Sequence, residues 1–283
     1  MKKIIITILL LNTMLLAKLS VAVSILPQKT FLEAIGGDKV LVELMVLPGN
    51  SPHNYDPKPS QMKGIAKASL YFAIGVEFEH VWLSKFSNLN SSMKIIDLTQ
   101  NIDKISISSH HHSNHNDKHN DDLAKDPHIW TSPKNVKVIA KNIYEALVEA
   151  DASNKSYYRK NYDLFVASVE STDREIKKIL ANFNGKKFMV FHPSWGYFAR
   201  DYNLVQMPIE LDGKTPKPRE LIELIKEAKK ENVTAIFTQP EFSDATAKVM
   251  ANELHINVVK VSPLNPKWSQ NLKNIANAIA GKH

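Results

Sequence analysis

Short apolar runs alternate with amphipathic segments in the first hundred residues. Two helix signals fall between such runs: Gly36 and Gly37 end one periodic segment, and Pro59 opens another. Strands that alternate with helices predict a parallel sheet covered by helices on both faces. The apolar runs that predict the strands lie at 19–25, 39–46, 70–75 and 93–98.

The same pattern returns after residue 184. Helices are predicted at 218–231 and 243–254, between further apolar runs. Each half of the chain is therefore expected to supply four strands of a mostly parallel sheet flanked by helices. The predicted strands of the second half lie at 186–191, 203–208, 234–239 and 257–262.

Two further helices are predicted between these halves. Ser132 and Pro133 form a favourable start, after which apolar residues recur at helical spacing from Val136 to Leu147. A second apolar seam predicts a helix over 153–183, about 45 Å long at the usual rise per residue. A helix of that length suits a rigid spine, so the expected fold is α/β with two lobes joined by this helix.

The N-terminus has the pattern of a secretory signal peptide. Two lysines precede about a dozen apolar residues, and a cut after Ala17 is the most plausible. An uncleaved anchor is the alternative, although the run is short for a span of about 20 residues. The predicted organisation is a signal peptide at 1–17, an N-terminal lobe at 18–152, a linking helix at 153–183 and a C-terminal lobe at 184–283.

Composition narrows the class of protein. The chain has no cysteine, which excludes disulfides, thiolate metal sites and a lipid-modified cysteine. Its formal net charge is +7, but the basic residues are dispersed and no nucleic-acid motif is present, so we expect no nucleic-acid partner. No HExxH, GxSxG, GxGxxG or Walker motif occurs, so no motif supports an enzyme.

The segment SISSHHHSNHNDKHNDD, residues 106–122, is the most unusual in composition. Imidazoles mixed with carboxylates are the ligands that zinc and its neighbours prefer. The alternative is a polar loop that is rich in histidine without binding metal. We call residues 106–125 the His-rich loop, and its histidines are His110, His111, His112, His115 and His119.

Three other histidines lie where a ligand site is expected. His53 follows the second predicted strand, His128 precedes a helix, and His192 comes directly after a strand. Ligand sites of open α/β sheets form beyond the carboxyl ends of the strands. Any one of these residues alone is more often a surface or hydrogen-bonded histidine, but together they could converge on one metal ion.

Three ordered segments carry a family resemblance: PGNSPHNYDPKPSQMKGIAKASLYFAIGVEFE, DPHIWTSPKNV and FHPSWGYFARDYNL. They resemble signature segments of the periplasmic metal-binding subunits of zinc and manganese ABC importers, above all the zinc-binding branch. The resemblance implies that His53, His128 and His192 bind the metal in a cleft between the lobes. It also implies a membrane permease as partner and an accessory role for the His-rich loop, which precedes the second ligand.

The fourth ligand is where the chain departs from part of that family. Many members have a carboxylate in a late loop, where this chain has Asn265, and others have Glu before the first histidine, where it has Pro52. Glu77, Glu79 and His80 remain, but we expect them to form the solvated start of a helix. We therefore expect three imidazoles plus a water, a nitrogen-rich set that favours zinc over manganese.

Further residues near these segments have more modest interpretations. His255 is expected on the surface. Three acids could orient a ligand histidine through its second ring nitrogen, namely Glu210, Asp212 and Glu241. Four aromatic residues either wall the cleft or belong to the core, namely Trp130, Trp195, Tyr197 and Phe198.

The sequence thus predicts a monomeric periplasmic receptor that captures Zn²⁺ and delivers it to an ABC transporter permease. A receptor for manganese or ferrous iron is the alternative within the same class. A zinc-dependent hydrolase is a more distant alternative, because a three-histidine site with an open position is also catalytic geometry. The last alternative is an adhesin stabilised by a structural metal.

Overall fold

The computed structural model describes residues 18–106, 125–210 and 214–282. The predicted signal peptide, the five histidines of the His-rich loop and Asp212 lie outside these residues. Among the helices that the structure describes, none is long and apolar enough to cross a membrane.

The first sheet has four parallel strands in the order β2-β1-β3-β4. Val21 of β1 pairs with Val42 on one side and Leu70 on the other. The last three residues of β1 and all of β3 are buried, which explains why the central strands read as continuous apolar runs. The strands are β1 (Leu19–Val23), β2 (Val40–Leu44), β3 (Leu70–Ala73) and β4 (Lys94–Asp97).

The second sheet repeats this arrangement, with the order β6-β5-β7-β8 and parallel pairing throughout. Alternate residues of β5 pack in two different hydrophobic clusters, because successive strand residues point to opposite faces of the sheet. Phe188 and Val190 join the large core shared with the first half, whereas Met189 packs in a separate cluster with Leu224 and Met250. The strands are β5 (Lys187–Val190), β6 (Val205–Pro208), β7 (Ala235–Thr238) and β8 (Asn257–Lys260).

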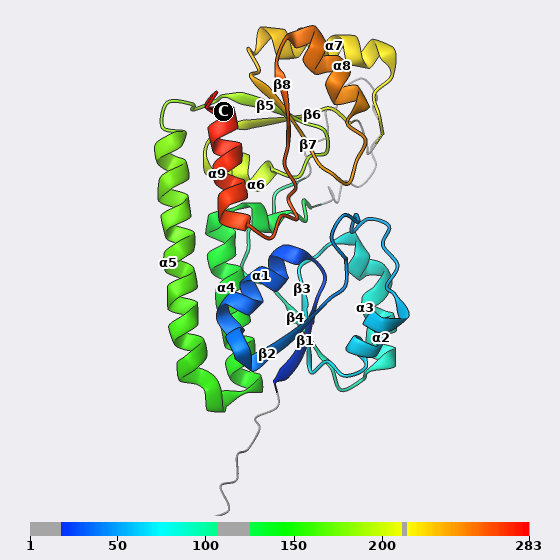
Figure 1. Ribbon diagram of the computed structural model, residues 1–283, viewed down its shortest axis with the longest axis vertical. Coiled ribbons are helices and arrows are strands. Elements are labelled where there is room, and N and C mark those ends of the chain that lie inside the picture. Colours follow the sequence, from blue (N-terminus) through cyan, green and yellow to red (C-terminus); the bar gives the residue numbers. More distant parts are fainter. Residues whose placement is uncertain (1–17, 107–124, 211–213, 283) are drawn as a thin grey trace, which may run out of the picture.

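All eight strands fall inside the predicted ranges, so the prediction of two four-stranded parallel sheets is confirmed. Helices cover both sheets, and Figure 1 shows the two sheets one above the other. The helices are α1 (Leu26–Gly36), α2 (Pro59–Ile65), α3 (Glu77–Leu89), α4 (Pro133–Ala150), α5 (Lys155–Ile179), α6 (Gly196–Asp201), α7 (Pro218–Lys230), α8 (Ala245–Leu254) and α9 (Trp268–Ile279).

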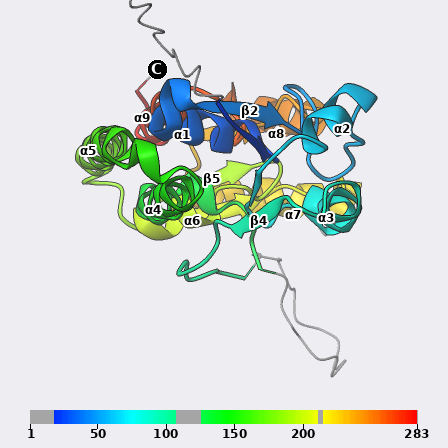
Figure 2. The ribbon, with the colours of Figure 1, turned by 90° about the horizontal axis from the view of Figure 1, so that it is seen from below.

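Helix α5 runs along one edge of the molecule beside both sheets (Figures 1 and 2). It packs against α1 and α4 from the first half and against α9 from the second. Its 25 residues make it about 37 Å long, shorter than predicted, because the chain leaves helical geometry at Leu180. The assignment of lobes and linker by residue number stays a prediction.

Two helices, α6 and α9, were not predicted from the sequence. The apolar residues of α9 have the helical spacing that identified other helices, with Trp268, Leu272, Ile275 and Ile279 all buried. Trp268 packs edge-on against Phe31 of α1, with ring centroids 5.6 Å apart. The C-terminal helix therefore returns to the first half of the chain and helps to hold the two sheets together.

Candidate metal centre

The three predicted ligand histidines come together between the two sheets. His53 lies in the loop after β2, His128 directly precedes a 3-10 turn (η2, Ile129–Thr131), and His192 follows β5. The ring centroid of His192 lies 5.1 Å from that of His53 and 5.4 Å from that of His128. Two imidazoles on one tetrahedral zinc, with zinc–nitrogen distances of about 2.0 Å, have centroids about 5 Å apart. The two distances from His192 are thus close to those between rings that share an ion.

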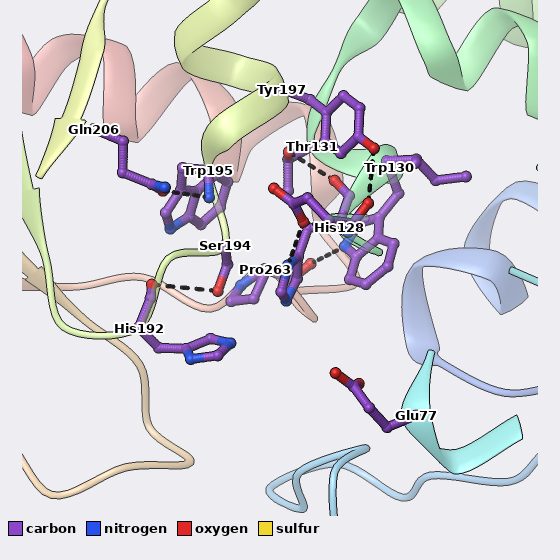
Figure 3. A network of polar contacts seen from close by, with 12 residues as sticks. Glu77, His128, Trp130, Thr131, His192, Ser194, Trp195, Tyr197, Gln206 and Pro263 are labelled. Atoms are coloured by element: carbon purple, nitrogen blue, oxygen red, sulfur yellow. Dashed lines mark hydrogen bonds and ion pairs between the residues drawn. The ribbon is translucent and has the colours of Figure 1, made fainter. Parts of the chain in front are cut away.

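Two of these rings are held by buried carboxylates. Nδ1 of His128 lies 2.8 Å from Oδ1 of Asp126, and Nδ1 of His192 lies 2.7 Å from Oε1 of Glu210. Figure 3 shows the rings of His128 and His192 reaching toward each other from the two halves of the chain. A carboxylate on Nδ1 fixes the tautomer in which Nε2 carries a free lone pair, as metal-binding histidines require.

The Nε2 atom of His192 is the most informative atom of the site. It is buried, and no hydrogen-bond partner lies near it in the described residues. A buried polar atom without a partner costs free energy and calls for an explanation. Because its lone pair faces the other two imidazoles, a metal ion is the partner that the surroundings fit.

His53 is the most exposed of the three histidines. Its Nδ1 lies 3.3 Å from Oε2 of Glu77, with the two side chains 35% and 43% exposed. The hydrogen bond with Glu77 raises the pKa of His53, against the effect of burial. Burial would raise the pKa of Glu77, but the hydrogen bond and charge of His53 outweigh it and lower that pKa to about 2. Glu77 is therefore a carboxylate anion beside the rings.

His192 is shifted in the opposite direction. Burial lowers the pKa of this imidazole; its hydrogen bond with Glu210 raises it, and the neighbouring His128 lowers it again. The lowered pKa keeps His192 neutral at pH 7, which is the form that binds a metal ion.

A small cavity lies among the three rings. Its volume is about 20 Å³, which is room for one water molecule or ion. No group of three or more His, Asp or Glu side chains in the described ranges already stands in position to hold a metal ion. Binding at this place therefore requires the side chains to draw together. The cavity is lined by Ser51, Pro52, His53, His128, Trp130, His192, Ser194, Gln239, Glu241, Phe242, Pro263 and Leu264.

Backbone contacts hold His192 in place. The side chain of Gln239 accepts from the backbone nitrogen of His192 at 3.4 Å and donates to its carbonyl oxygen at 3.1 Å. Phe242 stacks on the imidazole, with ring centroids 5.1 Å apart. Residues beyond the end of β7 thus fix His192, the predicted ligand that follows β5.

Asp126 is held by the second half of the chain. The Tyr197 hydroxyl donates to the backbone oxygen of Asp126 at 2.7 Å, while Asp126 itself accepts from the backbone nitrogen of His128. A Cβ on Gly196 would lie 2.8 Å from Oδ2 of Asp126, so the glycine permits this close approach. The position of His128 therefore depends on residues of α6.

The predicted aromatic residues divide into two groups. Trp130 lines the cavity and packs beside His128, with centroids 5.3 Å apart. Trp195, Tyr197 and Phe198 are buried in the core without lining the cavity. Of the two interpretations, a cleft wall applies to Trp130 and a place in the core applies to the other three.

The prediction of a solvated start of α3 is wrong for one of its three residues, Glu79. Glu79 is buried and accepts from the backbone nitrogens of Ile74 and Gly75, because the turn after β3 leaves these donors without strand partners. The Glu77 side chain is 43% exposed and in addition contacts His53. His80 is exposed as expected.

Other candidates are placed as follows. Glu210 contacts the ring of His192, as the sequence suggested, whereas Glu241 accepts from the hydroxyl of Ser262 at 2.9 Å. His255 is exposed at the end of α8. Asp126 was missed, although its place in Asp-Pro-His, two residues before a candidate ligand, was a usable signal.

A family model described as "Zinc-uptake complex component A periplasmic" matches residues 21–281. Two solved structures are similar over nearly the whole chain. A crystal structure of ZnuA is 41% identical, covers 94% of this chain and 99% of its own, and has a TM-score of 0.85. A zinc-bound ZnuA deletion mutant is 42% identical, covers 93% of this chain and 97% of its own, and has a TM-score of 0.84.

Curated relatives are similar at lower identity. The high-affinity zinc uptake system protein ZnuA of Bacillus subtilis is 29% identical over 242 residues, which is 84% of this chain and 76% of the relative. The manganese ABC transporter substrate-binding lipoprotein PsaA of Streptococcus anginosus is 26% identical over 231 residues, which is 79% of this chain and 73% of the relative. Relatives named for zinc and for manganese thus both occur.

Proposed function

Because the chain belongs to the periplasmic zinc-uptake complex component A family, we propose that His53, His128 and His192 bind one Zn²⁺ as its cargo. The protein is a solute-binding protein of an ABC transporter for zinc and not an enzyme. The three ligands and the identity of the bound ion are our assignment.

The observation that carries this assignment is the state of His192. One ring nitrogen is held by Glu210, and the other is buried and has no hydrogen-bond partner in the described part of the chain. Nδ1 of His128 is likewise held by a carboxylate, that of Asp126, so two imidazoles are oriented to bind through Nε2. Preparation of this kind lowers the cost of ordering the ligands when the ion enters.

Zinc is the proposed ion because imidazole nitrogen suits it, whereas manganese prefers carboxylate oxygen. The zinc-bound relative with 42% identity supports the same choice. Manganese and ferrous iron remain the alternatives, and the manganese-named relative with 26% identity is the reason to test manganese first.

Capture and release of the ion depend on which half of the chain carries each proposed ligand. His53 and His128 belong to the half of the chain that builds the first sheet, and His192 follows a strand of the second. A movement of one sheet relative to the other would break the ligand set without unfolding either sheet. We propose that contact with the permease of the transporter causes such a movement and releases the ion.

Export and the His-rich loop complete the proposal. The family is periplasmic, and residues 1–17 are proposed as the signal peptide that directs export. The loop is proposed as an accessory, weaker binder of zinc, on the strength of its five histidines. If instead the metal only stabilised an adhesin, removal of the metal would unfold the protein.

A competition titration tests the identity of the ion. The mature protein is loaded with Mn²⁺ or Fe²⁺ under anaerobic conditions, and zinc is added while bound metal is measured by elemental analysis. We expect micromolar zinc to displace both ions, and His255→Ala, which removes an exposed histidine, to behave as the native chain does. Retention of Mn²⁺ in the presence of zinc would identify a manganese receptor.

A further inference from the structure

Three carboxylates contact the proposed ligand rings, and one is held less firmly than the others. Asp126 and Glu210 lie 2.8 and 2.7 Å from their histidines, with side chains only 4% and 8% exposed. Glu77 lies 3.3 Å from Nδ1 of His53, and its side chain is 43% exposed. Asp126 and Glu210 are thus fixed in the protein interior, whereas Glu77 has room to change partners.

Other candidates for a fourth ligand are already engaged. Oε1 of Glu241 accepts from the Ser262 hydroxyl at 2.9 Å. Oδ1 of Asn265 accepts from the backbone nitrogen of Lys267 at 2.9 Å, and its amide points toward Asn271. One oxygen of Glu241 and the side chain of Asn265 are thus already held by neighbouring groups.

We propose that Glu77 is the fourth ligand of the bound ion, in place of the water that the sequence predicts. This inference rests on the proposed three-histidine site. Figure 3 shows Glu77 extending from the start of α3 toward the space between His128 and His192. When the ion enters, the carboxylate leaves Nδ1 of His53 and an oxygen binds the ion, which closes the set to three nitrogens and one oxygen.

The exchange of partners costs little at His53. That side chain is 35% exposed, so water can take over the hydrogen bond of its Nδ1. The same exchange at His128 or His192 would leave a buried ring nitrogen without a partner, because both rings are nearly covered. Glu77 is therefore the one of the three carboxylates that can leave its histidine without leaving a buried nitrogen unpaired.

Charge supplies the driving force. In the ligand set itself, three neutral imidazoles and a water leave both positive charges of Zn²⁺ in place, because Asp126 and Glu210 contact the rings of His128 and His192 and not the ion. Binding of the Glu77 carboxylate leaves a net charge of one. Because charges taken out of water are stable only when they are paired, the carboxylate is the better fourth ligand.

Cobalt spectroscopy tests this proposal, because the visible absorption of Co²⁺ reports on its ligands. The mature chain, Glu77→Gln and Glu241→Gln are each loaded with one Co²⁺ and titrated with sodium azide, and the pH is varied between about 6 and 9. A metal-bound water has a pKa of about 7 in open sites, and azide can replace it. Glu241→Gln is the matched control, since it removes the carboxylate that lines the cavity among the rings.

We expect the native chain and Glu241→Gln to show spectra that neither azide nor pH changes. Glu77→Gln should open a water position, so its spectrum should respond to both, and its zinc affinity should fall at least about tenfold. If Glu77 only positions His53, Glu77→Gln would lose affinity without any response to azide, and the proposal would be overturned. A response of the native chain to azide would overturn it as well.

The experiment distinguishes failure of the Glu77 proposal from failure of the proposed three-histidine site. His192→Ala, tested in the same way, should lose the bound cobalt whichever residue is the fourth ligand. A native chain that responds to azide while His192→Ala binds no cobalt would retain the three-histidine site and reject Glu77 alone. Binding of cobalt by His192→Ala with a native spectrum would reject both.

Discussion

Nδ1 of His192 lies 2.7 Å from Oε1 of Glu210, while Nε2 of the same ring is buried and has no hydrogen-bond partner among the residues that the structure describes. The two nitrogens of one imidazole thus have different surroundings. One end is anchored by an acid of the same half of the chain, and the other faces the histidines of the first half. This asymmetry is what a prepared metal ligand requires.

Glu210→Gln should weaken zinc binding by about 10- to 100-fold, the usual cost of losing an outer carboxylate partner of a ligand histidine. The substitution keeps the shape of the side chain and removes the charge that fixes the His192 tautomer. Calorimetric titration in competition with a chelator measures the change. Glu149→Gln, which removes a carboxylate from an exposed ion pair with Lys94, is the control and should leave zinc affinity unchanged.

Tyr197→Phe should reduce zinc affinity, because the lost hydroxyl holds the backbone oxygen of Asp126 at 2.7 Å and Asp126 orients His128. The free energy of unfolding should fall by about 1 kcal/mol, as for one hydrogen bond. Tyr202→Phe is a matched control: its hydroxyl donates to Asp173 at 3.0 Å, outside the site. Equal effects of the two variants on zinc affinity would show that Tyr197 does not position His128.

Glu79→Ala should destabilise the fold much more than it affects the stoichiometry of zinc binding. The side chain accepts from the backbone nitrogens of Ile74 and Gly75, and each unsatisfied donor costs about 1–3 kcal/mol. Urea denaturation of the metal-free protein measures the loss. A change below about 1 kcal/mol would mean that water replaces the carboxylate at this turn.

The His53–Glu77 pair predicts a pH window for the metal-free protein. Because the pKa of His53 is higher in the folded than in the unfolded protein, its contribution to stability is complete below the unfolded pKa of 6.5. The contribution is lost as pH rises through the folded pKa. Because the pKa of Glu77 is lower in the folded protein, its contribution to stability is complete above the unfolded pKa of 4.5. The contribution is lost as pH falls toward the folded pKa of about 2. The pair therefore stabilises the fold fully between pH 4.5 and 6.5.

Because both side chains are more than a third exposed, the contribution is less than about 1 kcal/mol. Glu77→Gln should lower the free energy of unfolding within that window, and less so at a pH above the raised pKa of His53, where that imidazole is neutral. Denaturation in the presence of a chelator at the two pH values checks this. An equal loss at both would show that the ion pair is not the cause.

The sequence predicts the fold because its signals are local. Each strand is a short apolar run, and α4 and α5 carry an apolar seam at helical spacing. Helix α9 carries the same signal from Trp268 to Ile279 and could have been predicted too. Its contacts with Phe31 could not, because they join residues more than two hundred positions apart.

The site divides in the same way. His53, His128 and His192 were identified from the turns around them and from a family resemblance. The burial of Glu79 and the contact of Glu77 with His53 were not predictable, because both acids begin a helix whose exposed or buried face is decided by tertiary packing. Local pattern locates the candidate ligands, and only the folded chain identifies the acids that hold them.

The central claim is that zinc binds to the three histidines between the sheets and not to the His-rich loop. The most direct measurement is zinc stoichiometry and affinity, by calorimetry with elemental analysis, on three mature proteins: the intact chain, a chain lacking residues 106–125, and His192→Ala. We predict that deletion of the loop leaves one tightly bound zinc and that His192→Ala abolishes it. Tight binding that disappears with the loop and survives His192→Ala would contradict the claim.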